Sequence, residues 1–350
     1  MQTKPRFLSG ILPAVVAGLF FMTAAAKAQS VPGLPENQLV LPAGTSTIPF
    51  IWQGDSIGRQ WEPHAALLIP VRLAHCPRQF YMQFDLGSPY SLLYRNMLTA
   101  IQRKYPQALP PGEPGKTLKN ISFEAGETHV TAGEIAVEQF DSTDIDWNDE
   151  SRMDIIGTIG TDLIDGKVAV IDYPGCQLSI SPVVPAALLP HLSLVDFTYV
   201  RRSILLPVKL QGDAKMIFFD TGSSMYELLT DESTCRQLAV HNTAHLRHQV
   251  KSWDKYITAN SFASNETIEI AGKKIPLRYS TYMEGVSDAQ VEQMAKMGIA
   301  GMTGNKLFLN YKLVLDTRNK KFGLIHAFGP SLKLDRSGEI TRKKYSEKSR

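Results

Sequence analysis

Residues 215–223 read KMIFFDTGS, an apolar run that ends in Asp-x-Gly-Ser, and much of the chain can be interpreted outward from it. Residues 80–88 read FYMQFDLGS and repeat the pattern. A further apolar run precedes each copy, SILLPVKL at 203–210 and ALLIPVRL at 66–73, with a short turn between. We therefore expect one unit to occur twice: a strand, a turn, and a second strand that leads into an Asp-x-Gly-Ser loop.

The repeat continues further along the chain. Residues 155–163 read IIGTIGTDL and residues 299–307 read IAGMTGNKL, and an apolar strand that ends in Asp follows each, at 168–172 and 313–316. One constant interval separates the matching glycines and the matching aspartates of the two copies. Because an accidental match rarely keeps such a register, the chain is predicted to be an internal duplication.

The duplication sets the domain organisation. The 350 residues allow two domains, and we place them at 60–185 and 200–327, with a linker at 186–199. Short segments bounded by Gly, Pro, Asn and Asp dominate both halves, so the fold class is predicted to be mainly β. Helical patterns are brief and cover Pro89–Lys104, Thr230–Leu238 and Ser287–Met297.

The two ends of the chain differ from the repeats. Residues 1–28 combine two early basic residues, a mostly apolar run and a small-x-small sequence at 26–28, which is typical of a cleavable export signal. A membrane anchor is the alternative, but Pro and Gly interrupt that run. We expect a leader at 29–59, a basic, disordered tail at 328–350, and no membrane span after cleavage. The protein is thus predicted to be exported, to the periplasm or the outside.

Composition excludes several other functions. There are 37 Lys and Arg against 34 Asp and Glu, so the balance of charge gives no argument for a nucleic-acid partner. The three cysteines lack the C-x-x-C spacing of a zinc or redox site. Export would make a disulfide possible, and Cys76 with Cys176, in the same half, is the candidate pair, whereas Cys235 is interpreted as a buried apolar residue.

Three histidines, His241, His245 and His248, are spaced almost as on one helical face. No Asp, Glu or Cys completes a metal site with them, so we interpret them as part of a solvated face. No metal and no cofactor is predicted.

The two Asp-x-Gly-Ser loops carry the chemistry. One such loop is a common hairpin turn. Two of them at equivalent points of a duplicated domain are brought together by pseudo-twofold packing, which would set Asp85 against Asp220. Two adjacent carboxyl groups cannot both ionise cheaply, so such a pair shares a proton and supplies one acid and one base. Together they could activate a water molecule.

These residues resemble the bilobal, pepsin-like aspartic proteases, whose two retropepsin-like lobes are similar to six-stranded barrels and supply one catalytic Asp each. Residues 218–224 match the active-site signature of that family, and residues 298–324 are similar to the end of its second lobe. The resemblance implies active-site loops and apolar-Gly strands behind them, formed by Gly87, Ser88, Thr221, Gly222, Ser223, Ile156, Gly157, Ala300 and Gly301.

The first lobe departs from the family pattern at two points. Leu86 replaces a Thr whose hydroxyl joins a mutual hydrogen-bond grip between the two loops, so only Thr221 can supply its half. The family also covers its cleft with a first-lobe hairpin that bears a Tyr. Residues 121–130 stand at about the right place but contain no Tyr.

The resemblance implies hydrolysis of peptide bonds by a water molecule held between Asp85 and Asp220, without metal or cofactor. The expected protein is an exported, monomeric aspartic endopeptidase that acts on peptides or proteins. Leu86 leaves open a catalytically impaired, peptide-binding relative. A structural all-β module, in which the two aspartates lie far apart, is the third possibility.

Overall fold

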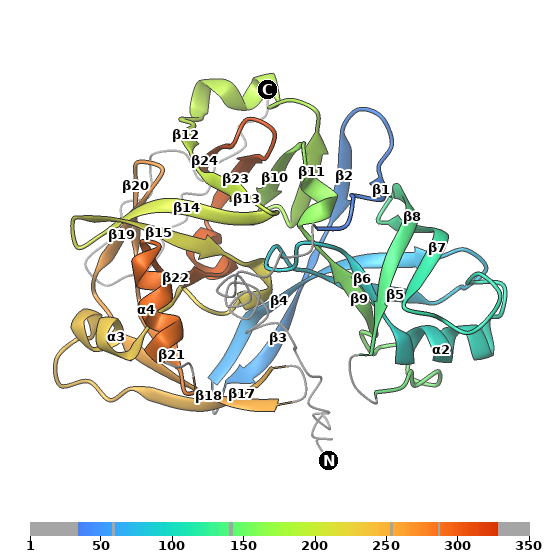
Figure 1. The fold of residues 1–350 in the computed structure, drawn as a ribbon, viewed down its shortest axis with the longest axis horizontal. Coiled ribbons are helices and arrows are strands. Elements are labelled where there is room, and N and C mark those ends of the chain that lie inside the picture. Colours follow the sequence, from blue (N-terminus) through green and yellow to red (C-terminus); the bar gives the residue numbers. More distant parts are fainter. Residues whose placement is uncertain (1–33, 58–59, 140–142, 253–254, 286–287, 328–350) are drawn as a thin grey trace, which may run out of the picture.

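The computed structural model describes residues 34–57, 60–139, 143–252, 255–285 and 288–327. Two β lobes flank a third sheet to which both contribute (Figure 1). No helix among these residues is long and apolar enough to cross a membrane. The predicted export signal and basic tail lie outside the described residues.

The first lobe is an eight-stranded sheet. The strand order is β1 (Leu39–Val40), β8 (Thr128–Glu138), β6 (Leu92–Tyr94), β9 (Ile155–Ile159), β5 (Gln79–Phe84), β4 (Gln60–Leu73) and β3 (Ile51–Ile57), and β7 (Thr117–Ala125) pairs with β4 and β8. Helix α2 (Arg95–Lys104) follows β6 and buries one face, and a 3-10 turn (Thr161–Ile164) follows β9.

The second lobe is a ten-stranded sheet. The strand order is β17 (Leu246–Ser252), β18 (Lys255–Ala263), β21 (Tyr279–Met283), β16 (Leu228–Leu229), β22 (Ile299–Thr303), β15 (Asp213–Phe219), β14 (Ser203–Leu210), β19 (Thr267–Ile270) and β20 (Lys273–Pro276), and β13 (Thr198–Val200) pairs with β14. The helices are α3 (Glu232–Leu238), α4 (Asp288–Lys296) and 3-10 turns at Thr221–Ser223 and Asn305–Phe308.

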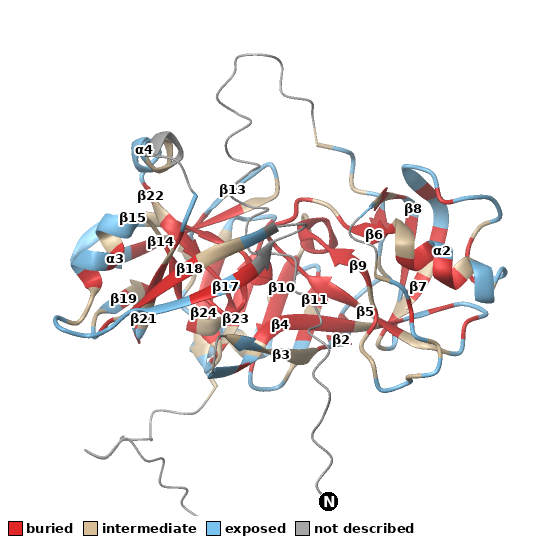
Figure 2. Ribbon diagram, turned by 90° about the horizontal axis from the view of Figure 1, so that it is seen from below, coloured by how far each residue is buried: buried red, intermediate tan, exposed pale blue. Residues whose placement is uncertain are grey.

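The third sheet joins the halves. Its order is β12 (Val195–Asp196), β24 (Lys321–His326), β23 (Tyr311–Asp316), β10 (Val168–Asp172), β11 (Gln177–Ser181) and β2 (Ser46–Pro49). At its centre β10 of one half pairs antiparallel with β23 of the other, residue for residue along both strands. A short 3-10 helix (Ala186–His191) follows β11. Buried residues, coloured red on the ribbon of Figure 2, continue from one lobe through this sheet into the other.

The strand registers confirm the duplication. In each half a hairpin, β4–β5 or β14–β15, ends at the Asp loop, and the last strand before the loop pairs in parallel with a later one, β5 with β9 and β15 with β22. Both parallel pairs carry a register shift at the same point, after Tyr81 and after Met216. The mainly β, two-lobed fold class is therefore confirmed.

Several details differ from the sequence prediction. The sheets contain eight, ten and six strands, because each half lends strands to the shared sheet and adds short edge strands. The predicted leader is built into the fold, since β2 pairs with β11 and β3 pairs with β4. The predicted linker likewise contains β12 and most of β13, which pair with β24 and β14.

The predicted disulfide is wrong. Cys76, Cys176 and Cys235 are all free thiols. Cys76 follows β4 in the first-lobe sheet, whereas Cys176 lies in the hairpin between β10 and β11 of the shared sheet, where its thiol donates to Tyr173 O at 3.7 Å. Membership of the same half of the sequence does not bring the two residues together, because that half is divided between two sheets.

Candidate active site

Asp85 is held at the end of β5 by the backbone. Its N–H donates to Ile159 O at 2.9 Å, which ties the loop to β9. One carboxylate oxygen accepts from the Gly87 N–H at 2.9 Å. Ser88 Oγ donates instead to Tyr90 O at 2.7 Å. The loop thus directs the Asp85 side chain without a hydroxyl donor of its own.

Asp220 occupies the equivalent place after β15. Its N–H donates to Thr303 O at 3.0 Å. Its carboxylate accepts from the Gly222 N–H at 2.8 Å and from Ser223 Oγ at 2.9 Å. The second loop therefore stabilises a negative charge with one more donor side chain than the first.

The structure brings the two loops face to face. The carboxyl groups of Asp85 and Asp220 hydrogen-bond each other. A Cβ atom at Gly87 would lie 2.5 Å from Asp220 Cγ, and one at Gly222 would lie 2.6 Å from Asp85 Cγ. Each glycine is therefore required by the carboxyl group of the other lobe, which is a reciprocal arrangement that neither loop could form alone.

Burial and proximity together fix the protonation of the pair. Asp85 is 5% exposed and Asp220 is fully covered. Loss of hydration, then the charge of Asp220 and the hydrogen bond to it, raise the pKa of Asp85 well above the usual range. Burial also raises the pKa of Asp220, but donors from Asp85, Ser223 and Gly222 oppose the rise. Two adjacent buried carboxyl groups cannot both ionise cheaply, so the pair shares one proton and carries one negative charge.

Thr221 locks the two loops together. Its Oγ1 donates to Phe84 O at 2.7 Å and accepts from the Leu86 N–H at 2.8 Å, both across the lobe boundary. At the symmetry-related position Leu86 has no hydroxyl and is completely buried. Half of the expected mutual grip is present, and the side chain of Leu86 packs in the core in place of the other half.

The residues behind the loops correct one prediction. Gly157 and Gly301 were expected to support the active-site loops, but a Cβ at either position would strike Leu92 O or Leu229 O of the neighbouring strands. Ile156 and Ala300 lie beside them on β9 and β22. The two strands do lie behind the loops, and they contact them two residues further on, where Ile159 O and Thr303 O accept from the Asp85 and Asp220 N–H groups.

The glycines that touch the loops are Gly160 and Gly304. A Cβ atom there would come within 2.8 Å of Ser88 O and within 2.0 Å of Ser223 O, respectively. The residue after each glycine donates to the carbonyl of the residue that follows the loop Asp. Thr161 Oγ1 donates to Leu86 O at 2.9 Å, and Asn305 Nδ2 donates to Thr221 O at 2.9 Å. The constant spacing of these glycines was the sequence signal for this pair of contacts.

The shared sheet supports the second loop from behind. Tyr173, fully buried after β10, donates its hydroxyl to Asn305 Oδ1 at 2.7 Å, and Asn305 also donates to Ser224 Oγ at 3.0 Å. Ser224 Oγ donates to His64 O of β4 at 2.8 Å. These residues have no motif in the sequence, because the contacts depend on how the three sheets pack.

Residues 121–130, which stand at about the place where the resembling family has its flap, form part of a sheet instead. They belong to the β7–β8 hairpin, whose turn packs onto Pro49, and Gly126 N donates to Pro70 O at 3.2 Å. This hairpin is part of the sheet wall. Residues 105–116, between α2 and β7, form no strand. In the second lobe the corresponding place between α3 and β19 is occupied by the β17–β18 hairpin.

The described residues contain no cluster of three or more His, Cys, Asp or Glu that could hold a metal ion. The three histidines do not share a helical face. His248 lies on β17 and only 9% of its surface is exposed, so the prediction of a solvated face is wrong for it.

No family model and no curated protein matches the chain. Among solved structures, the aspartic proteinase from Irpex lacteus is similar, with 11% sequence identity, a TM-score of 0.46, and coverage of 81% of this chain and 97% of that chain. The function proposed below therefore rests on the geometry of this chain's own site.

Proposed function

We propose that the chain is an aspartic endopeptidase, which hydrolyses peptide bonds with a water molecule activated between Asp85 and Asp220. The single observation that supports it best is the buried pair of carboxyl groups, each packed against the glycine of the opposite lobe's loop. Two turns with a purely structural role would not require each glycine to pack against the carboxyl group of the opposite loop.

We assign the shared proton to Asp85, because Gly222 and Ser223 both donate hydrogen bonds to the carboxylate of Asp220. The ionised Asp220 takes a proton from water as the water oxygen attacks the scissile carbonyl carbon. Asp85 gives its proton to the carbonyl oxygen, which becomes a hydroxyl of the tetrahedral intermediate. When the C–N bond breaks, Asp220 returns its proton to the leaving nitrogen and Asp85 recovers one from the hydroxyl. Protons and charge balance over the cycle.

Leu86 is compatible with this mechanism. It removes one hydroxyl from the grip between the loops, and a neutral hydrogen bond contributes about 0.5–1.5 kcal/mol net. The Thr221 half of the grip, the Asp85–Asp220 hydrogen bond and the contacts from Thr161 and Asn305 all remain. The loss weakens the loop without displacing either carboxyl group.

One observation favours a second candidate, a peptide-binding protein without turnover. Asp220 is fully covered, so a substrate carbonyl reaches the pair only if the covering groups move or if the carbonyl approaches from the side of Asp85. In either case we propose export as the setting, from the sequence of residues 1–28.

The experiment is a proteolysis assay at acid and neutral pH on the purified chain, with products mapped by mass spectrometry. A peptidase of this kind gives internal cleavages that a pepstatin-type inhibitor blocks and that Asp220→Asn abolishes. Proteolysis that persists in Asp220→Asn would overturn the assignment. Binding of peptides without any cleavage would select the second candidate.

A further inference from the structure

The β17–β18 hairpin distinguishes the second lobe from the first. Strand β19 corresponds to the end of β7, since Val208 pairs with Ile270 as Val71 pairs with Ala125. The first lobe has only residues 105–116 between its helix and that strand, whereas the second has β17 and β18. Strand β17 contacts β3 of the first lobe, so two hairpins, β3–β4 and β17–β18, meet beside the Asp220 loop (Figure 1).

A cavity of about 70 Å³ lies where they meet. Its walls come from β3–β4, from β17–β18 and from the segment that directly follows the Asp220 loop, and include Trp61, Glu62, Tyr226, His248 and Lys306. The Tyr226 N–H donates to Ser223 O at 3.1 Å, and its carbonyl accepts from the Gly304 N–H at 3.1 Å. The cavity is thus attached to the loop that carries Asp220.

Two polar side chains of this cavity have no hydrogen-bond partner among the described residues. The unpaired groups are the Tyr226 hydroxyl and both ring nitrogens of His248. Tyr226 is 3% exposed and His248 is 9% exposed, and the unpaired oxygen and nitrogen atoms themselves have almost no surface that water can reach. Burial lowers the pKa of His248, so its ring is neutral and offers one donor and one acceptor. Buried polar groups are normally paired, so a polar occupant that widens this cavity enough to reach these atoms would satisfy them.

Five other polar side chains of the wall already have partners. Ser261 and Thr281 hydrogen-bond each other at 2.8 Å. Glu62 forms an ion pair with Lys306. Glu227 accepts from two backbone N–H groups, at 2.5 and 3.1 Å. Among the buried side chains of the described wall, the polar atoms without a partner are those of Tyr226 and His248.

The surroundings of those two groups select among possible occupants. An acidic side chain would face the carboxyl groups of Glu62 and Glu227, and a basic one would face Lys306. An apolar side chain would leave Tyr226 and His248 unpaired, which a site built for hydrogen bonding rejects strongly. A neutral carboxamide supplies one acceptor and two donors, which match a hydroxyl and a neutral imidazole. Water molecules would also fit, since about 10–15 Å³ of such a volume is enough for each.

We propose that this cavity is a substrate subsite selective for an uncharged carboxamide side chain, Asn or Gln, which Tyr226 and His248 recognise by hydrogen bonds. The proposal rests on the proposed peptide-binding and peptidase function. It makes the β17–β18 hairpin a specificity element that the first lobe does not possess.

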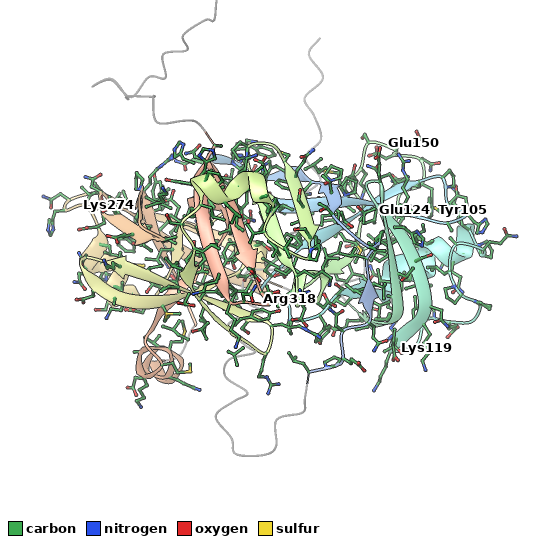
Figure 3. All side chains as sticks on the ribbon, turned by 90° about the horizontal axis from the view of Figure 1, so that it is seen from above. Tyr105, Lys119, Glu124, Glu150, Lys274 and Arg318 are labelled. Atoms are coloured by element: carbon green, nitrogen blue, oxygen red, sulfur yellow. The ribbon has the colours of Figure 1, made fainter. Side chains whose placement is uncertain are left out.

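The first experiment profiles cleavage sites in a complex peptide mixture. The wild type is expected to prefer Gln or Asn over Met or Leu, which are similar in size, by about tenfold or more in kcat/KM at one position near the cleaved bond. Tyr226→Phe removes only the hydroxyl, and His248→Phe removes both nitrogens, so each is expected to reduce that preference to about threefold or less. The control, Tyr105→Phe, lies at the far end of the first lobe and leaves the preference unchanged (Figure 3).

The second experiment measures binding by calorimetry to the Asp220→Asn chain, with peptides that carry Gln, Met or Glu at the same position. The subsite is supported if the Met and Glu peptides bind more weakly than the Gln peptide, and if Tyr226→Phe makes the affinities for the Met and Gln peptides equal. This result supports the subsite whether or not the wild type cleaves. Cleavage by the wild type without the preference, equal binding of the Gln and Met peptides, or a preference that survives both cavity substitutions would overturn it. Absence of cleavage alone argues against the peptidase and not against the subsite.

Discussion

The Gly87→Ala substitution perturbs the carboxyl pair with a single added carbon. A Cβ atom at this position would lie 2.5 Å from Asp220 Cγ and Oδ1, where ordinary contacts begin near 3.4 Å, so the Asp220 carboxyl group must move by about 1 Å. The backbone at Gly87 does not have the left-handed conformation that would strain an alanine there. The clash is therefore with Asp220 itself.

The expected loss can be estimated from what holds Asp220. Its carboxylate accepts from Gly222 and Ser223 and hydrogen-bonds Asp85, so it cannot retreat without stretching these contacts. A misplacement of about 1 Å in a catalytic group costs roughly 100-fold in rate. Overpacking in a buried site costs roughly 1–3 kcal/mol in the free energy of unfolding. We expect kcat to fall by about 100-fold or more while the chain remains folded.

The assay pairs kcat for peptide cleavage with denaturant unfolding of the same preparations. Gly115→Ala is the matched control, because its nearest neighbour would lie at 3.7 Å, an ordinary contact, and it should behave as the wild type in both measurements. A folded Gly87→Ala chain with activity within about threefold of the wild type would show that the loops do not press on each other's carboxyl groups as described.

Three other substitutions test separate parts of the site. Leu86→Thr restores the missing hydroxyl and should raise kcat/KM severalfold over Leu86→Val, which has nearly the same shape without the hydroxyl; equal kinetics for both would contradict the role assigned to the grip. Tyr173→Phe leaves Asn305 Oδ1 without its donor and should lower the free energy of unfolding by about 1–3 kcal/mol in denaturant titration, and an unchanged midpoint would count against that support. Because the pKa of Asp85 is raised, the folded chain holds a proton that the unfolded chain releases, and the free energy of unfolding falls as pH rises above the ordinary Asp range. The midpoint temperature of thermal unfolding should therefore fall less for Asp85→Asn than for the wild type between about pH 4 and pH 8. Parallel curves of midpoint against pH for the two chains would refute the raised pKa.

The duplication made the fold and the central pair predictable from sequence. Strand patterns before Asp85 and Asp220 recur with constant spacing, and such local signals determine which loop each residue occupies. The long-range arrangement was less accessible: Gly160 and Gly304, rather than Gly157 and Gly301, contact the loops, because parallel pairing places the strand ends there.

Other features depend on packing that no local pattern records. Cys76 and Cys176 lie in one half of the sequence but in different sheets. His248 belongs to a spacing typical of a solvated helix face, yet it faces a cavity because β17 packs against β3. Tyr173 reaches Asn305 only through the sheet shared by both lobes.

The proton shared by Asp85 and Asp220 can be observed without any substrate, by infrared difference spectroscopy of the carboxyl C=O band at neutral pH. Other buried carboxyl groups contribute equally to every chain and cancel when the wild type is compared with Asp85→Asn and Asp220→Asn. We expect the wild type to show one protonated carboxyl group that both variants lack or shift. A neutral-pH spectrum identical in all three chains would contradict the paired, singly protonated site on which the proposed function depends.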